Sequence, residues 1–141
     1  MSNKKILVVD DDPDVRLDLQ LRLNANHYDT ICAGDGVASI AEARKQMPDL
    51  MILDLGLPAG DGFSVLERMK ANEKLSSIPV IVLSGRDRVN NRDRALKAGA
   101  KTFLQKPIAN DKLLAVIRMV LEAKDQRAPV VYDLPGPEAG A

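Results

Sequence analysis

The sequence has little of several residue types, and each shortage excludes a class of protein. Its single cysteine, Cys32, excludes an internal disulfide and a metal site built from several thiolates, and it agrees with a reducing cytoplasm, where we expect the protein to reside. Aromatic residues make up only 3% of the chain, which leaves few rings for stacking on nucleic-acid bases. No charge is in excess, because 20 basic residues balance 20 acidic ones, and we therefore expect no direct contact with nucleic acid.

Long hydrophobic runs are also missing. No run approaches the roughly 20 apolar residues that cross a bilayer, and no apolar signal segment follows the amino-terminal residues, so no membrane partner is expected. Hydrophobic residues nevertheless make up 45% of the 141 residues. A chain of this length and composition can build the core of one compact domain.

Short apolar runs predict the strands of that domain. Four clear runs and a weaker fifth lie at Ile6–Val9, Leu50–Leu53, Val80–Leu83, Thr102–Leu104 and, the weaker one, Thr30–Ala33. Runs of this length without alternation are typical of strands buried on both faces.

Stretches of helical composition separate these runs. The predicted helices cover Gly36–Gln46, Phe63–Ala71, Asn90–Ala98 and a final segment capped by Asn110. Together with the segment after the first strand, they give five strand–helix units in alternation. The pattern predicts an α/β fold, a single doubly wound (βα)5 domain whose five-stranded parallel sheet has helices on both faces.

The segment over residues 12–24 carries a conflicting pattern. Its apolar residues alternate with polar ones, as in a strand: Val15, Leu17, Leu19, Leu21 and Leu23. Asp12–Pro13 is instead a helix-start signal, because proline suits the first helical position, and we interpret the segment as a helix. Each residue of a helix turns by about 100°, so Val15, Leu19 and Leu23 should face the sheet, with Leu17 and Leu21 on the opposite side.

Polar residues follow the predicted strands at their carboxyl ends. Asp10–Asp12 end the first strand, Asp54 the third and Ser84 the fourth, and Lys106 follows the fifth. The carboxyl ends of parallel strands open onto one crevice. Neighbouring carboxylates repel and need a cation, and their hard oxygen atoms suit Mg²⁺. A lysine charge and a serine hydroxyl complete a set that suits phosphoryl transfer, in which a carboxylate can be the nucleophile.

Four fragments together resemble the receiver domain of response regulators: Ile6–Pro13, Leu53–Gly62, Val80–Gly85 and Phe103–Pro107. They occur in the order and at the spacings of that family, and the likeness covers roughly residues 4–124. The resemblance implies a flavodoxin-like strand order, 2-1-3-4-5. It also implies a switch and not an enzyme, which accepts a phosphoryl group from a histidine kinase or histidine phosphotransferase and thereby changes its affinity for a downstream effector.

The resemblance also implies a role for each matching residue at the acidic end of the sheet. Asp54 matches the phosphoacceptor. Asp11, Asp54 and the backbone carbonyl of Gly56 match direct Mg²⁺ ligands, and Asp10 matches a carboxylate that acts through water. Gly56 and Arg86 occupy variable positions that resemble the family's tuners of dephosphorylation.

Three further matches concern phosphate contact and switching. Lys106 and Ser84 match residues that contact the phosphoryl oxygens. Phe103 matches an aromatic switch residue that turns inward as the Ser84 position engages phosphate. Ser84 stands where threonine is more common, and it keeps the hydroxyl group. Phe103 stands where tyrosine is more common, and it keeps the aromatic ring.

Other interpretations remain open beside this one. A haloacid-dehalogenase-like phosphohydrolase would need a second aspartate two residues after the nucleophile, where Gly56 stands. A degenerate receiver that binds partners without phosphorylation is disfavoured, because every acceptor-site residue is present.

The expected domain covers residues 1–124, and the Pro/Gly-rich residues 125–141 are expected to form a flexible tail or a linker stub. No pattern of a DNA-binding or cyclase domain follows Lys124. A free-standing receiver and the front of a longer protein both stay open, as does a homodimer.

Overall fold

The computed structural model describes residues 3–57, 62–85 and 88–124. Within these residues the strands and α-helices alternate as β1 (Lys5–Val9), α1 (Pro13–Ala25), β2 (Asp29–Ala33), α2 (Gly36–Gln46), β3 (Leu50–Leu53), α3 (Gly62–Ala71), β4 (Val80–Ser84), α4 (Arg88–Lys97), β5 (Thr102–Gln105) and α5 (Asn110–Lys124). A short 3-10 helix, η1 (Leu75–Ser77), lies between α3 and β4. The alternation predicted from the sequence is confirmed.

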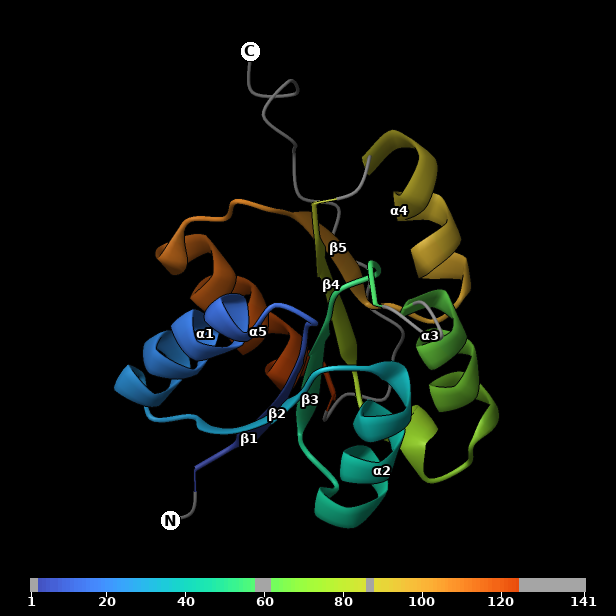
Figure 1. The fold of residues 1–141 in the computed structure, drawn as a ribbon, viewed down its shortest axis with the longest axis horizontal. Helices are drawn as coiled ribbons and strands as arrows, with labels where there is room; N and C mark the ends of the chain where they lie inside the picture. Colours follow the sequence, from blue (N-terminus) through green and yellow to red (C-terminus); the bar gives the residue numbers. More distant parts are fainter. Residues whose placement is uncertain (1–2, 58–61, 86–87, 125–141) are drawn as a thin grey trace.

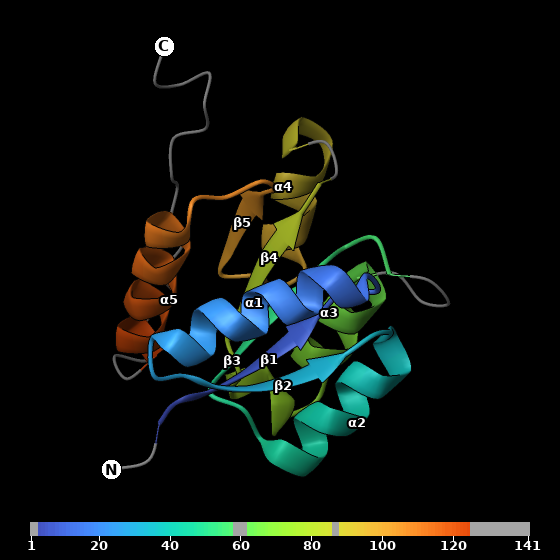
Figure 2. The same cartoon turned by 60° about the vertical axis from the view of Figure 1, so that its left-hand side comes forward.

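The five strands form one parallel sheet in the order β2-β1-β3-β4-β5, as predicted. Helices α1 and α5 cover one face of this sheet, and α2, α3 and α4 cover the other (Figures 1 and 2). The chain leaves β1 toward β2 on one side and returns to β3 on the other side of β1. The carboxyl ends of β1 and β3 therefore flank the point where the strand order reverses, which is where ligands of such sheets bind.

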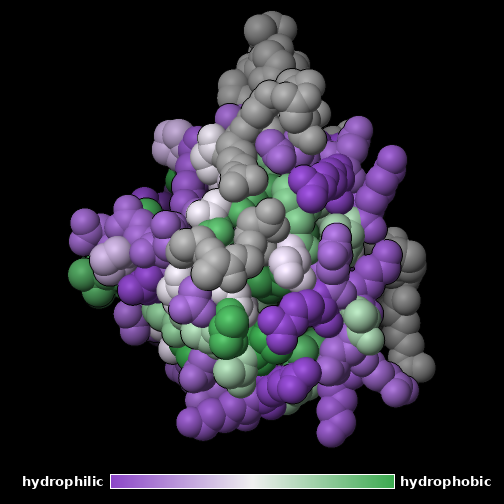
Figure 3. Space-filling model, turned by 45° about the vertical axis from the view of Figure 1, so that its right-hand side comes forward, coloured by the Kyte–Doolittle hydropathy of each residue, from purple (hydrophilic) through white to green (hydrophobic). Residues whose placement is uncertain are grey.

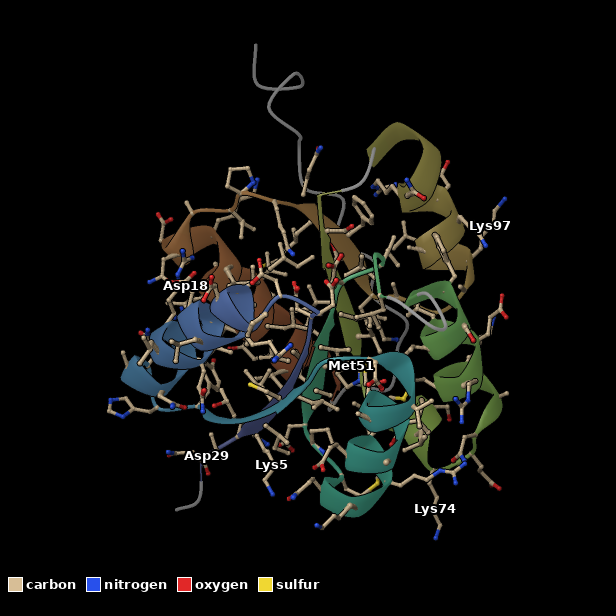
Figure 4. All side chains as sticks on the ribbon, in the orientation of Figure 1. Lys5, Asp18, Asp29, Met51, Lys74 and Lys97 are labelled. Atoms are coloured by element: carbon tan, nitrogen blue, oxygen red, sulfur yellow. The ribbon has the colours of Figure 1, made fainter. Side chains whose placement is uncertain are left out.

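The sheet divides the core into two clusters because successive strand residues point to opposite faces. In β1, Leu7 and Val9 pack with α2, α3 and α4, whereas Ile6 and Val8 pack with α1 and α5. Met51 of β3 lies in the middle of the molecule, far from peripheral side chains such as Lys97 (Figure 4). Buried aliphatic side chains on both faces thus hold the strand ends in fixed positions.

Helix α1 resolves the conflicting pattern in favour of a helix. Its amino-terminal cap is Asp12, whose side chain accepts a 2.9 Å hydrogen bond from the backbone of Asp14. Leu19 and Leu23 are buried against the sheet, as expected. On the outer face, Leu17 and Leu21 are 54% and 61% exposed.

Two local predictions need correction, and one short helix was not predicted. Helix α4 begins at Arg88, two residues earlier than predicted. Helix α5 begins at Asn110 itself, and the preceding Ala109 accepts its first backbone hydrogen bond, from Leu113. The sequence did not predict η1, which follows a turn where the Asn72 side chain accepts hydrogen bonds from the next residues.

Other predictions fall on residues outside the described ranges. These are the role of Arg86 and the tail at 125–141. Within the described ranges, no helix is long and apolar enough to span a bilayer.

Candidate functional site

Two aspartates lie side by side where β1 and β3 end. Val9 of β1 pairs with Leu53 of β3, so Asp10 and Asp54 are the next residues along neighbouring strands. The backbone N–H of Asp54 donates to the carbonyl of Val9 at 2.9 Å, and the N–H of Asp10 donates to the carbonyl of Ala33 at 3.1 Å. These bonds continue the sheet ladder by one residue and fix both aspartates relative to the sheet.

Asp11 completes an acidic cluster with these two residues. One carboxylate oxygen from each of Asp10, Asp11 and Asp54 lies within 4.8 Å of the others. Asp10 is buried, Asp54 half-buried and Asp11 exposed, so the cluster opens to solvent on one side. Hard oxygen donors at an open edge of this kind are the ligands that Mg²⁺ prefers, because Mg²⁺ keeps several waters alongside one or two carboxylates. The donor set therefore fits a magnesium ion.

Lys106, which follows β5, reaches across the sheet edge to this cluster. Its Nζ lies 2.6 Å from Oδ2 of Asp10 and 3.6 Å from Oδ2 of Asp54. Burial alone would lower the pKa of Lys106, but the hydrogen bond to Asp10 and the negative charges of both aspartates outweigh it and raise the pKa. Lys106 is therefore a fixed cation at neutral pH.

The three carboxylates differ in how the protein holds them. Both oxygens of Asp10 accept hydrogen bonds, Oδ1 from the backbone N–H of Asp12 at 2.9 Å and Oδ2 from Lys106. Oδ1 of Asp54 accepts a 3.1 Å hydrogen bond from the N–H of Gly56. Nζ of Lys106 lies 3.6 Å from Oδ2 of Asp54, slightly beyond hydrogen-bond distance. Oδ2 of Asp54 is thus the less constrained oxygen of the two residues, whereas each oxygen of Asp10 accepts a hydrogen bond.

The structure places Ser84 and Phe103 near the same edge but deeper, and Gly56 at the surface. Ser84 is the last residue of β4 and is fully buried, and its carbonyl accepts a 2.9 Å bond from the N–H of Lys106. Phe103 is 4% exposed and packs into the cluster on the α4 side of the sheet. Gly56 is exposed beside Asp54. The three aspartates therefore lie together with Lys106 against Asp10 and Asp54, Ser84 is tied to Lys106 through its carbonyl, and Phe103 lies in the core.

Sequence reasoning missed two residues of the site. A β-carbon at Gly62 would lie 2.6 Å from Cα of Leu55 and 2.8 Å from the carbonyl oxygen of Asp54, so only glycine fits there. The Gly62 N–H also donates to the carbonyl of Leu55 at 3.0 Å, which ties the start of α3 to the residue after Asp54. The sequence indicated only a turn. The second missed residue is Arg16, whose Nη1 donates to the carbonyl of Asp10 at 2.7 Å.

Comparison with known families gives a match over most of the chain. The model of the response regulator receiver domain matches residues 6–118. A solved CheY-like receiver domain protein from Methanospirillum hungatei superposes with a TM-score of 0.83 at 25% identity, and the match covers 90% of this chain and 100% of that one.

Curated relatives are longer than this chain. The DNA-binding dual master transcriptional regulator RpaA of Synechocystis sp. is 34% identical over 122 residues, which cover 86% of this chain and 51% of the relative. Response regulator PleD of Caulobacter vibrioides is 37% identical over 121 residues, which cover 85% of this chain and 26% of the relative. The shared part is the fold that carries the acidic cluster.

Proposed function

The chain belongs to the response regulator receiver domains of two-component signalling, and we propose that Asp54 is its phosphoacceptor in a Mg²⁺-dependent reaction. The observation that carries the proposal is the acidic cluster of Asp10, Asp11 and Asp54 with Lys106 reaching into it at the sheet edge. Three carboxylates and one lysine can bind a divalent cation and a phosphoryl group together. The cation reduces the repulsion between the carboxylates and the phosphoryl group, and the phosphoryl group reduces the repulsion between the cation and the lysine.

The same geometry supports a role for each group. Asp11, Asp54 and the carbonyl of Gly56 would hold Mg²⁺ directly, with Asp10 behind a water molecule. The ion would supply charge neutralisation on the phosphoryl oxygens. An oxygen of Asp54 attacks phosphorus as the phosphorus–nitrogen bond of a phosphohistidine breaks, and the leaving imidazole nitrogen keeps the electron pair and takes a proton from solvent.

Lys106 and Ser84 would then move to contact the oxygens of the new phosphoryl group. Lys106 lies only 3.6 Å from Asp54, so a small movement away from Asp10 brings its ammonium group to a phosphoryl oxygen. Ser84 would donate its hydroxyl to another phosphoryl oxygen, and Phe103 beneath α4 would follow that movement as the switch residue. The strand ends of β4 and β5 carry both groups, so this part of the sheet would repack first.

Response regulators interact with histidine kinases and downstream effectors. For this chain the proposed donor is the phosphohistidine of a kinase or a phosphotransferase, and the cytoplasm is the proposed compartment. The chain spans 51% of RpaA and 26% of PleD, so the likeness covers only part of each relative and does not extend to its whole activity. The effector and a homodimer stay predictions.

Receiver domains are in general phosphoacceptor switches, and we propose that this one catalyses only its own phosphorylation and dephosphorylation. The phosphohydrolase alternative is not favoured, because Gly56 offers no carboxylate at the position where that chemistry needs one.

Phosphorylation with acetyl phosphate tests the proposal. Wild-type protein should gain one phosphoryl group by intact mass with Mg²⁺ and none with EDTA, and Asp54→Ala should gain none. Asp18→Ala is the matched control, because Asp18 lies on the outside of α1 in an ion pair with Arg22 and should label normally (Figure 4). Normal labelling of Asp54→Ala, or labelling in EDTA, would contradict the assignment, and steady turnover of a phosphomonoester would favour the hydrolase.

A further inference from the structure

Arg16 on α1 turns back over the loop between β1 and α1. Its Nη1 donates a 2.7 Å hydrogen bond to the backbone carbonyl of Asp10, and this carbonyl belongs to the peptide group that joins Asp10 to Asp11. On the other side of Asp10, its N–H donates to the carbonyl of Ala33 at 3.1 Å. Asp10 is therefore held from both sides, by the end of β2 and by a charged side chain.

Gly34, the residue after β2, makes room for this arginine. A β-carbon at Gly34 would lie 3.1 Å from Nη1, 3.7 Å from Cζ and 4.0 Å from Nη2 of Arg16. The guanidinium group thus lies over the backbone of Gly34, and a β-carbon there would require it to shift by a few tenths of an ångström relative to Asp10. Gly34 and Arg16 form one support for the loop, although they come from different strand–helix units.

Asp11 depends on this support more than its two acidic neighbours do. Lys106 also holds Asp10, and the sheet ladder holds Asp54. Asp11, in contrast, is exposed in the loop that Arg16 supports. The negative charges of Asp10 and Asp54, within 4.8 Å, repel the carboxylate of Asp11, so its position needs support from the backbone. Groups that orient metal ligands typically raise metal affinity about 10- to 100-fold.

We propose that Arg16, seated on Gly34, is a positioning residue that holds the Asp10–Asp11 peptide in the orientation that Asp11 needs to bind Mg²⁺. The inference rests on the proposed function, because it takes Asp10, Asp11 and Asp54 as the metal site. It adds a residue that touches neither the metal nor the phosphoryl group.

The sign of the effect separates positioning from simple electrostatics. Arg16 is a cation near a cation site, so loss of its charge alone would reduce repulsion and tighten Mg²⁺ binding. Loss of a positioning bond has the opposite result and weakens Mg²⁺ binding. The direction of the change in Kd therefore distinguishes the two roles.

Mg²⁺ titration of the folded protein, followed by calorimetry well below Tm, measures that direction. Arg16→Met keeps the apolar stem and removes the donors, and we expect it to raise the Kd for Mg²⁺ about 10- to 100-fold. Arg16→Lys keeps one charged donor and should recover part of the loss. Arg22→Met is the matched control on the same helix, because Arg22 pairs with Asp18 at 3.0 Å, and its Kd should equal that of the wild type.

Gly34→Ala completes a double-mutant cycle. It should raise the Kd in the same direction but by less, and the double variant Gly34→Ala/Arg16→Met should be no weaker than Arg16→Met alone, since both changes act through the same hydrogen bond. Additive effects would overturn the joint role of these residues. A lower Tm in EDTA together with an unchanged Kd would show a merely structural role and overturn the proposal.

Cys32 supplies an independent reporter of where Arg16 lies. Burial raises the pKa of the Cys32 thiol, and the positive charge of Arg16 opposes that rise. Arg16→Met should therefore shift the pH profile of Cys32 alkylation to higher pH, and an unchanged profile would contradict the placement of Arg16.

Failure of this inference can be distinguished from failure of the proposed function. If the wild-type protein is phosphorylated and binds Mg²⁺, and Arg16→Met binds Mg²⁺ equally well, only the role of Arg16 is refuted. Wild-type protein that does not bind Mg²⁺ would refute the metal site and this inference with it.

Discussion

Helices α4 and α5 flank the same strand, β5, but different kinds of side chain attach them to the sheet. Helix α5 buries four aliphatic side chains almost completely: Leu113, Val116, Ile117 and Val120. Among the described side chains of α4, at residues 91–97, only Ala95 is buried. Full burial of a larger aliphatic side chain contributes about 1.5–3 kcal/mol, so these four side chains of α5 supply several times the burial energy of residues 91–97 of α4.

Cationic side chains replace aliphatic ones where α4 meets α3. The guanidinium group of Arg94 lies 3.7 Å from the centre of the Phe63 ring, and Nζ of Lys70 donates to the carbonyl of Lys97 at 3.3 Å. A groove of about 620 Å³ runs between the two helices, lined by Phe63, Glu67, Lys70, Ala71, Arg94, Lys97 and Ala98. Figure 3 shows this side of the molecule, with hydrophobic residues in the middle and hydrophilic residues around them.

The comparison indicates where phosphorylation can act at low energetic cost. Ser84 ends the strand that leads toward α4, and Lys106 follows the strand that leads toward α5. A new charge on Asp54 would pull on both residues. Because residues 91–97 of α4 bury less apolar surface than α5 does, we expect α4 to move and α5 to stay in place.

The largest expected effect concerns the ring beneath α4. Phe103→Ala should lower the free energy of unfolding by about 3–5 kcal/mol, because the ring is buried and its loss leaves a cavity. Urea denaturation measures this loss, and labelling with acetyl phosphate measures the site separately. If Phe103 is also the switch residue, phosphate-dependent partner binding should fall further than labelling does. A loss of less than about 1 kcal/mol would show that α4 collapses onto the vacated space.

The second prediction tests the two helix anchors directly. Ile117→Ala in α5 should cost about 2–5 kcal/mol, whereas Ala95→Gly in α4 should cost about 1–2 kcal/mol from the lost methyl group and the poorer helix propensity. Urea denaturation in EDTA measures the loss of unfolding free energy for both variants. Equal costs for the two changes would remove the basis of the comparison.

The sequence predicts the site and the helix anchors to different extents. Asp10, Asp54, Ser84 and Lys106 could be predicted because each follows a buried run, and parallel strands bring their carboxyl ends together without further information. In α5, the helical spacing of the sequence predicts Leu113, Ile117 and Val120 on the buried side, as the structure has them, but it also predicts Leu114 and Leu121, which are half-buried, and it misses the buried Val116.

Features that depend on the close approach of distant segments could not be predicted. The preference of Lys106 for Asp10 over Asp54 depends on differences of about 1 Å between side chains from three strands. The need for glycine at position 62 arises from the backbone of Leu55, and Arg16 finds Asp10 only because Gly34 leaves space. The start of α4 was placed too late because its first turn carries no apolar stripe.

A smaller effect is expected from the contact between α3 and α4. Arg94→Gln removes the cation above Phe63 and should cost about 0.5–1 kcal/mol, the usual range at an exposed site. Lys97→Gln is the matched control on the same helix and should change the unfolding free energy less. Amide hydrogen exchange should become faster in α4 and stay unchanged in α5. Faster exchange in both helices would mean that they are not attached independently.

The smallest expected effect on stability is at the outer face of α1. Leu17 and Leu21 are 54% and 61% exposed and lie one helical turn apart, on the side of α1 opposite the buried Leu19 and Leu23. Substitution of exposed residues usually changes stability by less than about 0.5 kcal/mol, so Leu17→Lys/Leu21→Glu should fold normally. Labelling with acetyl phosphate should also be normal, because neither side chain belongs to the acidic cluster.

The same double variant should slow phosphoryl transfer from the cognate histidine donor. Two exposed leucines one turn apart give a helix-against-helix contact its apolar centre, and charges at both positions would have to be desolvated when the partner docks. Val37→Lys is the control, because Val37 is a 69% exposed apolar residue on another helix, α2. Transfer rates from the histidine donor and from acetyl phosphate are measured on the same preparations. Equal slowing by both donors would place the defect in the site, and unchanged transfer from the histidine donor would refute docking at this face.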